Sequence, residues 1–95
     1  MNILLKKSPL SQKKFRVVLE NGTHVDFGAK GYQDFTQHKD PARMRLYVIR
    51  HSKRENWKRS GINTAGFWSR WLLWSKPSLP EAIRFMNKKF SLKIH

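Results

Sequence analysis

The segment from Phe15 to Phe27 reads FRVVLENGTHVDF, and it predicts a β-hairpin with its turn at Asn21-Gly22. A two-residue turn would place polar Asp26 and His24 among the apolar side chains of one face. A loop of three residues, 20–22, with Gly22 in the left-handed conformation, keeps that face apolar. Because a slip of one residue turns a strand over, we expect this second register. The residues that then share the apolar face are Phe15, Val17, Leu19, Val25 and Phe27.

Three helices are expected after the hairpin, each with its own start signal. Asp40-Pro41 provides an N-cap followed by proline at the first helical position, and this helix should end between Arg54 and Lys58. Thr64 caps a second helix, from Ala65 to Trp74. Ser78 and Glu81 have the spacing of a capping box before the third helix.

The apolar patterns assign a place to each of these elements. The second helix is apolar on nearly all sides, which is typical of a helix in the middle of a domain. The alternation of Leu92 and Ile94 with Lys93 predicts a short third strand at the C-terminus. We therefore expect an α+β fold in which the hairpin packs on about three helices. Residues 15–95 should form this single domain, and residues 1–14 a basic N-terminal arm. The third helix has an apolar stripe made of Leu79, Ala82, Ile83, Met86 and Phe90.

The charge of the chain points to a polyanionic partner. Lys and Arg number 20 against 6 Asp and Glu, which gives a formal net charge of +14. A magnitude of roughly 2–8 is ample for the solubility of a small domain. The excess positive charge repels itself in a compact chain unless a polyanion relieves it. The absence of Cys excludes disulfides and thiolate metal sites. No membrane partner is expected, since Arg70 and Lys76 bracket the longest apolar stretch.

The candidate nucleic-acid-binding residues are basic side chains in two groups. In the first helix, Met44, Tyr47, Val48 and His51 cover one arc, and basic residues cover the opposite side. Guanidinium groups on such a face match phosphate oxygens in pairs. The N-terminal arm supplies a second, mobile contact. The two groups are Arg43, Arg50, Lys53, Arg54, Lys58 and Arg59, and then Lys6, Lys7, Lys13 and Lys14.

The four tryptophans have two interpretations. Trp68, Trp71 and Trp74 are spaced like core residues of a helix, so we expect them inside, with Trp71 largely buried. The alternative is stacking on single-stranded bases. Trp57 is the better stacking candidate, because basic residues surround it.

Catalytic and metal-binding interpretations are weaker. His38-Lys39-Asp40 resembles part of a phosphodiesterase pattern, but Asp40 is better explained as a helix cap. His51 and Glu55 stand four residues apart, yet two groups alone do not make a metal site or a catalytic set. We therefore expect no enzyme activity, no catalytic residues, no metal and no cofactor.

Three segments resemble a small uncharacterised family encoded by large nucleocytoplasmic DNA viruses, including giant viruses, algal viruses and iridoviruses. The resemblance implies a viral protein that is made in the host cell, in the cytoplasm or the viral factory, and it makes the virion a further expected location. It implies no active site. The segments that carry it are Asp26–Tyr32, Phe35–Asp40 and Ser60–Trp74.

The expected function is that of a small basic nucleic-acid-binding protein without sequence specificity, associated with a viral genome, DNA rather than RNA. The first alternative is a minor structural protein of the virion that binds acidic faces of other virion proteins. Weaker alternatives are a nuclease-like enzyme and a protein that binds at a membrane interface through Trp and Lys.

Overall fold

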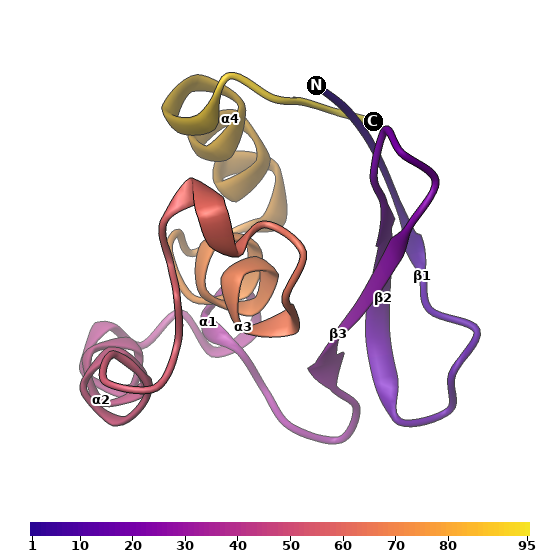
Figure 1. Cartoon of the computed structure of the whole chain (residues 1–95). Helices are drawn as coiled ribbons and strands as arrows, with labels where there is room; N and C mark the ends of the chain where they lie inside the picture. The colour runs from indigo at the N-terminus through magenta and orange to yellow at the C-terminus, as the bar shows by residue number, and fades with distance from the viewer.

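The computed structural model describes all 95 residues, and its helices cover one face of a four-stranded sheet (Figure 1). The sheet has the order β3-β2-β1-β4. β2 is antiparallel to both β3 and β1, whereas β1 and β4 run parallel. This arrangement confirms the α+β fold class. The strands are β1 (Asn2–Lys7), β2 (Lys13–Val18), β3 (His24–Ala29) and β4 (Lys93–Ile94).

The hairpin of β2 and β3 has the predicted register. Val17 pairs with Val25 and Arg16 with Asp26, and the backbone N–H of Leu19 donates to the Thr23 carbonyl at 2.8 Å. Gly22 has a φ of 87°, a conformation that a β-branched residue resists. The apolar face of the hairpin is therefore turned to the core, where Val17, Val25 and Phe27 are buried.

The prediction of a basic arm over residues 1–14 is wrong, because β1 occupies the middle of the sheet. Leu5 pairs with Val17 of β2, and on the other side Ile3 pairs with Ile94 of β4. Ile3 is fully buried, whereas its neighbour Leu4 is exposed, which is the alternation of a half-buried strand. Ser8 ends the strand, and its hydroxyl donates to Asp26 at 2.7 Å. The basic residues of this segment are therefore held in place.

The helices begin at the predicted caps. The side chains of Asp40, Thr64 and Ser78 accept backbone N–H groups of the first turns that follow them. The first long helix ends at His51, earlier than predicted, because Ser52 already closes its last turn. The predicted second helix changes to a π-helical turn at Ser69. The elements are α1 (Phe35–His38), α2 (Pro41–His51), η1 (Arg59–Gly61), α3 (Ala65–Trp68), η2 (Ser69–Leu73) and α4 (Leu79–Phe90).

The core lies between the sheet and the layer formed by α3, η2 and α4. Trp68 is fully buried there, and its indole N–H donates to the Ile62 carbonyl at 2.6 Å. Trp71 is partly buried and packs against this core without being enclosed by it as Trp68 is. Its indole N–H donates to the Trp57 carbonyl at 2.9 Å, at the rim of the core. The other large side chains without exposed surface are Phe27, Phe67, Ile3, Leu72 and Met86.

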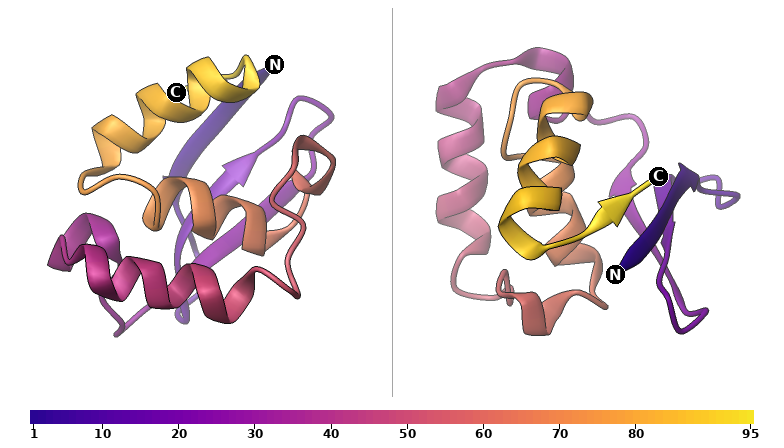
Figure 2. Two further views of the ribbon diagram at one scale, coloured as in Figure 1. Left: turned by 90° about the vertical axis from the view of Figure 1, so that its left-hand side faces the viewer. Right: turned by 90° about the horizontal axis from the view of Figure 1, so that it is seen from above.

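α2 forms an outer layer on the side of α3 and η2 that faces away from the sheet (Figure 2). No residue of α2 is fully buried. Tyr47 and His51 are half-buried on its inner side, as the sequence predicted for this arc. The helix is therefore attached to the domain by its inner side chains alone, and most of its surface faces solvent.

The predicted C-terminal strand is confirmed in β4, and its partner is β1 instead of the hairpin. The backbone N–H of Lys93 donates to the Met1 carbonyl at 2.9 Å, and that of His95 donates to Ile3 at 2.8 Å. The two ends of the chain therefore lie side by side (Figure 1). None of the helices is both long and apolar enough to cross a membrane.

Candidate nucleic-acid interface

The outer surface of α2 carries the predicted bases together with apolar residues that the sequence analysis missed. Arg43 and Arg50 are exposed, as expected. Leu46 is 50% exposed and Ile49 is 68% exposed, in the middle of the same surface. At 100° per residue both lie opposite the inner arc, so the helical pattern contained this signal. The face is therefore mixed instead of purely basic.

The basic residues that follow α2 do not form one continuous surface with the outer face of the helix. Lys53 and Arg54 are exposed just beyond its end. Lys58 precedes η1, and Arg59 lies within it. The Arg59 guanidinium donates to the Phe90 carbonyl at the end of α4, so it is partly engaged inside the protein. Arg59 therefore acts first as a cap of α4 and is a weak candidate for a phosphate contact.

The bases of the former arm have different surroundings. Lys14 forms an ion pair with Asp34 at 2.7 Å and also donates to Gln37 at 2.8 Å. The side chains of Lys14 and Asp34 are only 14% and 5% exposed, so this pair ties β2 to the start of α1. Lys6 and Lys7 are exposed on β1, and Lys13 is half-buried on β2. The main role of Lys14 is therefore structural, and it is a weaker candidate for ligand binding than the exposed lysines.

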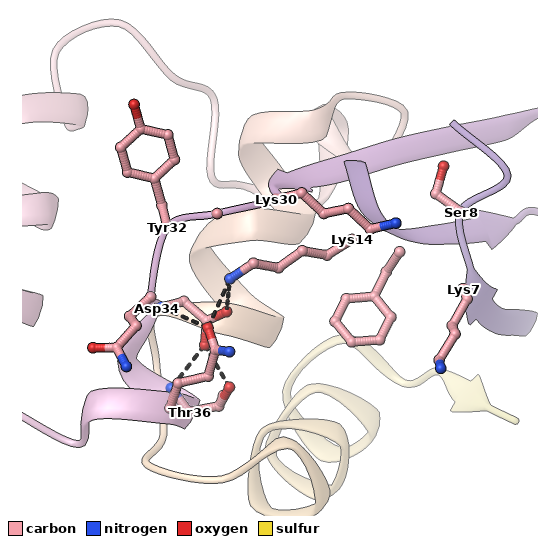
Figure 3. Close-up of a pocket in the computed structure, with 11 residues that line it drawn as sticks. Lys7, Ser8, Lys14, Lys30, Tyr32, Asp34 and Thr36 are labelled. Atoms are coloured by element: carbon pink, nitrogen blue, oxygen red, sulfur yellow. Dashed lines mark hydrogen bonds and ion pairs between the residues drawn. The ribbon is translucent and has the colours of Figure 1, made fainter. Parts of the chain in front are cut away.

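Three adjoining pockets run from the end of the sheet to α2. The first has a volume of about 570 Å³ and lies between the end of β1, Lys30 and the start of α1 (Figure 3). The second, of about 370 Å³, lies beside Gly28 and Trp74, and the third, of about 250 Å³, lies against α2. Tyr32 and Gln33 line all three, so the pockets share these two residues as a common wall, and we call the three together the Tyr32 groove. The bases that line it are Lys7, Lys13, Lys14, Lys30, Arg43 and Arg50.

The groove thus brings together bases from both predicted groups. Arg43 and Arg50 come from α2, and Lys7, Lys13 and Lys14 come from the strands. Lys30 was not among the predicted residues, because nothing in its local sequence places it beside α1. The predicted bases that do not line the groove are Lys6, Lys53, Arg54, Lys58 and Arg59.

The aromatic residues near the groove differ in how accessible their rings are for stacking on a nucleobase. Tyr32 is 76% exposed and was not predicted as a site residue. Trp57, the predicted stacking residue, is half-buried, and its ring is nearly parallel to Tyr47 with centroids 6.4 Å apart. The Arg70 guanidinium lies 5.4 Å from the Trp57 ring centre. Trp57 is therefore already engaged by protein groups, whereas Tyr32 is free.

Few of the bases are neutralised within the protein. Among all Lys and Arg side chains, Lys14 and Arg16 make ion pairs with carboxylates. The hydrogen bond from Arg16 lowers the pKa of Asp26 to about 2. Two of the four remaining acids have structural tasks: Asp40 caps α2, and Glu20 pairs with the N-terminal amine. The net positive charge is consequently carried on the surface by bases without an acidic partner.

The residues considered for catalysis have structural tasks as well. The His38 ring accepts the backbone N–H of Asp40 through Nδ1 at 2.9 Å. Burial, with Arg43 nearby, lowers the pKa of His38, so the neutral ring is favoured. His51 stacks on Tyr47 with ring centres 4.3 Å apart. No cluster of three or more His, Cys, Asp or Glu side chains is arranged to hold a metal ion.

The fold and the groove define a small α+β protein with a strongly basic surface. Residues 3–51, more than half of the chain, match DUF5754, a family of unknown function, and the protein therefore belongs to this family. No curated protein and no solved structure matches the chain. The resemblance to viral proteins stays a prediction, because the family description does not bear on it.

Proposed function

We propose that the protein binds nucleic acid through its phosphate backbone, without sequence preference. The observation that carries the proposal is the set of basic side chains without a carboxylate partner that line the Tyr32 groove and the exposed side of α2. Of 20 Lys and Arg side chains, Lys14 and Arg16 are in ion pairs with carboxylates, and the groove and α2 carry several of the others. A polyanion would relieve the repulsion among them and would release its own counterions.

The chemistry of these bases favours phosphate over other anionic groups. Arg43 and Arg50 are exposed guanidinium groups, which pair with two phosphate oxygens at once. Lys7 and Lys30 add point charges at the other end of the groove. Contacts to phosphate set position but carry little sequence information. The resemblance to proteins of large DNA viruses favours the viral genome as the partner, in the host cytoplasm or the viral factory.

The test is a salt titration of binding to labelled duplex DNA, single-stranded DNA and RNA. If about six bases contact B-DNA phosphates, log affinity should fall with log salt at a slope near −5. The double variant Arg43→Glu/Arg50→Glu should weaken binding to all sequences and flatten the slope.

The matched control is Arg84→Glu/Lys88→Glu, which changes the charge equally on exposed positions of α4 outside the groove. It should weaken binding less. Equal losses in the two double variants would show that only net charge matters and would overturn the proposed interface. No binding to any nucleic acid at about 50 mM salt, where phosphate contacts are strongest, would overturn the function itself.

A second candidate function is favoured by Leu46 and Ile49. Both are exposed among the bases of α2, and apolar residues add nothing to phosphate binding. They suit a contact with an acidic protein surface, such as another virion protein. Ile49→Ser should leave nucleic-acid affinity unchanged, because Ile49 is exposed on α2 but does not line the Tyr32 groove. If the protein bound poly-glutamate more tightly than any nucleic acid, and this variant weakened that binding, the second candidate would replace the first.

A further inference from the structure

We propose that the Tyr32 groove holds one unpaired strand of nucleic acid, with a base stacked on the ring of Tyr32. This inference rests on the proposed function and specifies the form of nucleic acid that the groove accepts. It starts from the exposure of Tyr32, which is 76%, the highest among the large apolar side chains of the chain. Figure 3 shows the ring projecting away from the contact between Lys14 and Asp34.

The position of Tyr32 in the groove suits a stacking platform. It follows Gly31, whose φ of 89° turns the chain after β3, and it precedes the capping residues of α1. Tyr32 lines every one of the three pockets, so a strand that follows the groove passes its ring. Base–aromatic stacking accepts any base, because every base has a π face. The arrangement therefore provides affinity without sequence preference.

Cations lie on both sides of this platform. Lys7 and Lys30 line the pocket at the sheet end, and Arg43 and Arg50 line the pocket beside α2. The phosphates that flank a base on Tyr32 would meet these two groups in turn. Such a combination of a basic track with an exposed ring is typical of proteins that bind single strands.

The acids that line the groove, Asp34 and Glu55, are outnumbered by its six basic residues. Asp34 is only 5% exposed, and Lys14 pairs with it at 2.7 Å. Glu55 lies against Gly66, in the first turn of α3, where the backbone N–H dipoles favour a negative charge. The net field in the groove is therefore set by the free bases.

The size of the recesses favours a single strand over a duplex. The two larger pockets, of about 570 and about 370 Å³, have the volumes of sites for small molecules, so each is large enough for a nucleotide. The bases of a duplex are stacked and paired, and exposing one to Tyr32 costs a few kcal/mol of unstacking. The phosphates of a duplex can consequently contact the exposed Lys and Arg side chains, but its nucleobases cannot stack on the ring of Tyr32.

The experiment measures fluorescence anisotropy with four labelled probes of about 12 nucleotides, a length within the range of compact single-strand sites. The probes are single-stranded DNA of mixed sequence, RNA of the same sequence, the DNA duplex, and an abasic strand that keeps only the phosphates. We expect single-stranded DNA to bind at least about fivefold more tightly than duplex or abasic DNA, the lower bound for one stacked base. If the side chains of Lys7, Lys30, Arg43 and Arg50 contact phosphates, its log affinity should fall with log salt at a slope of about −3.

Variants of Tyr32 separate stacking from charge. Tyr32→Ala should lose at least about fivefold affinity for single-stranded DNA and RNA, and nothing for the abasic strand. Tyr32→Phe should restore tight binding, because it keeps the ring. Leu10→Ala is the matched control, since Leu10 is 48% exposed and lies outside the groove. It should bind like the original protein.

The outcomes distinguish this inference from the function on which it rests. Binding of duplex and abasic DNA as tight as that of single-stranded DNA, unchanged in Tyr32→Ala, would overturn the single-strand inference and leave phosphate binding intact. Failure to bind any of the four probes would overturn both.

Discussion

The phenol ring of Tyr47 lies flat against the indole of Trp74, with ring centres 4.4 Å apart and 2° between the planes. Burial raises the pKa of Tyr47 to about 12, so its hydroxyl stays protonated. Because α2 has no fully buried residue, this stack is a main attachment of the helix to Trp74, the residue that follows η2. It therefore fixes the position of Arg43 and Arg50 relative to the rest of the groove.

Trp74→Ala should loosen α2 while leaving the sheet intact. An aromatic pair contributes about 0.5–1.5 kcal/mol beyond the area that it buries, so protection of the α2 amides from hydrogen exchange should fall by roughly tenfold or more. Amides of β2 and β3 should keep their protection. Trp74→Phe retains a flat ring, so the protection of its α2 amides should lie between that of Trp74→Ala and that of the original protein. If α2 amides kept full protection in Trp74→Ala, other contacts would hold the helix.

Trp68→Ala should destabilise the protein more than Trp71→Ala. Trp68 is fully buried and donates to Ile62, so its removal should cost about 3–5 kcal/mol, most of a small domain's stability. Trp71 is partly buried at the rim of the core, so Trp71→Ala should lower the free energy of unfolding less than Trp68→Ala. Urea unfolding of both variants gives the comparison, and equal losses would contradict the assignment of Trp68 to the centre of the core.

Lys14→Met should destabilise the fold, because it leaves the Asp34 carboxylate buried without its cation. Removing one partner of a buried pair costs about 3 kcal/mol or more. Lys7→Met is the matched control: Lys7 is exposed and unpaired, so the expected change is within about 0.5 kcal/mol. Binding should respond in the opposite order, with Lys7→Met weakening nucleic-acid affinity in protein that remains folded. If Lys14→Met unfolded at the same temperature as the original protein, the pair of Lys14 with Asp34 would not be needed for stability, and the prediction would be wrong.

His38 should make stability fall as the solution is acidified. Its pKa is lowered from 6.5 in the folded protein, so the unfolded chain takes up the proton first. The stabilising contribution is therefore complete above about pH 7 and is lost as the pH falls from 6.5 through the lowered folded value. Protonation also removes the acceptor that Nδ1 offers to the Asp40 N–H.

The measurement is urea unfolding at about pH 7.5 and about pH 5.5, on either side of the ordinary pKa of His. His38→Asn provides an acceptor that does not titrate, so its stability should change less over this range. The other three histidines are common to both proteins, so the difference isolates His38. Identical pH dependence in the two proteins would contradict the prediction.

Gly22→Val should destabilise the hairpin through backbone strain alone. A side chain at Gly22 would meet no atom within 4 Å, so the cost comes from its φ of 87°. Holding a residue other than glycine in this region costs about 1–3 kcal/mol. Gly22→Asn should cost less, since Asn tolerates the left-handed conformation. Equal melting temperatures for the Val variant and the original protein would show that the loop rearranges without loss.

What could be predicted from the sequence was mainly local. The register around Gly22 and the caps at Asp40, Thr64 and Ser78 depend on neighbours within a few residues, and all are confirmed. β1 was missed because its short apolar run is stabilised by pairing with residues 15–18 and 93–94, which are distant in the chain.

The candidate site shows the same division. Arg43 and Arg50 were found because helical periodicity places them on the outer side of α2. Tyr32 and Lys30 were missed because the groove forms only where the loop after β3 meets α2 and the end of β1. The pairing of Lys14 with Asp34 spans 20 residues, so no local pattern distinguishes Lys14 from the free lysines.

The parallel pairing of β1 with β4 also sets an order of events during synthesis. Asn2 and Ile3 find their partners only when Lys93 and Ile94 have left the ribosome. At typical elongation rates this delay is on the order of 5 to 20 s. During that time one edge of β1 presents free N–H and C=O groups, which a strand of another nascent chain could pair with. The pairing of β4 with β1 thus covers an edge of the sheet that stays open until the C-terminal strand has formed.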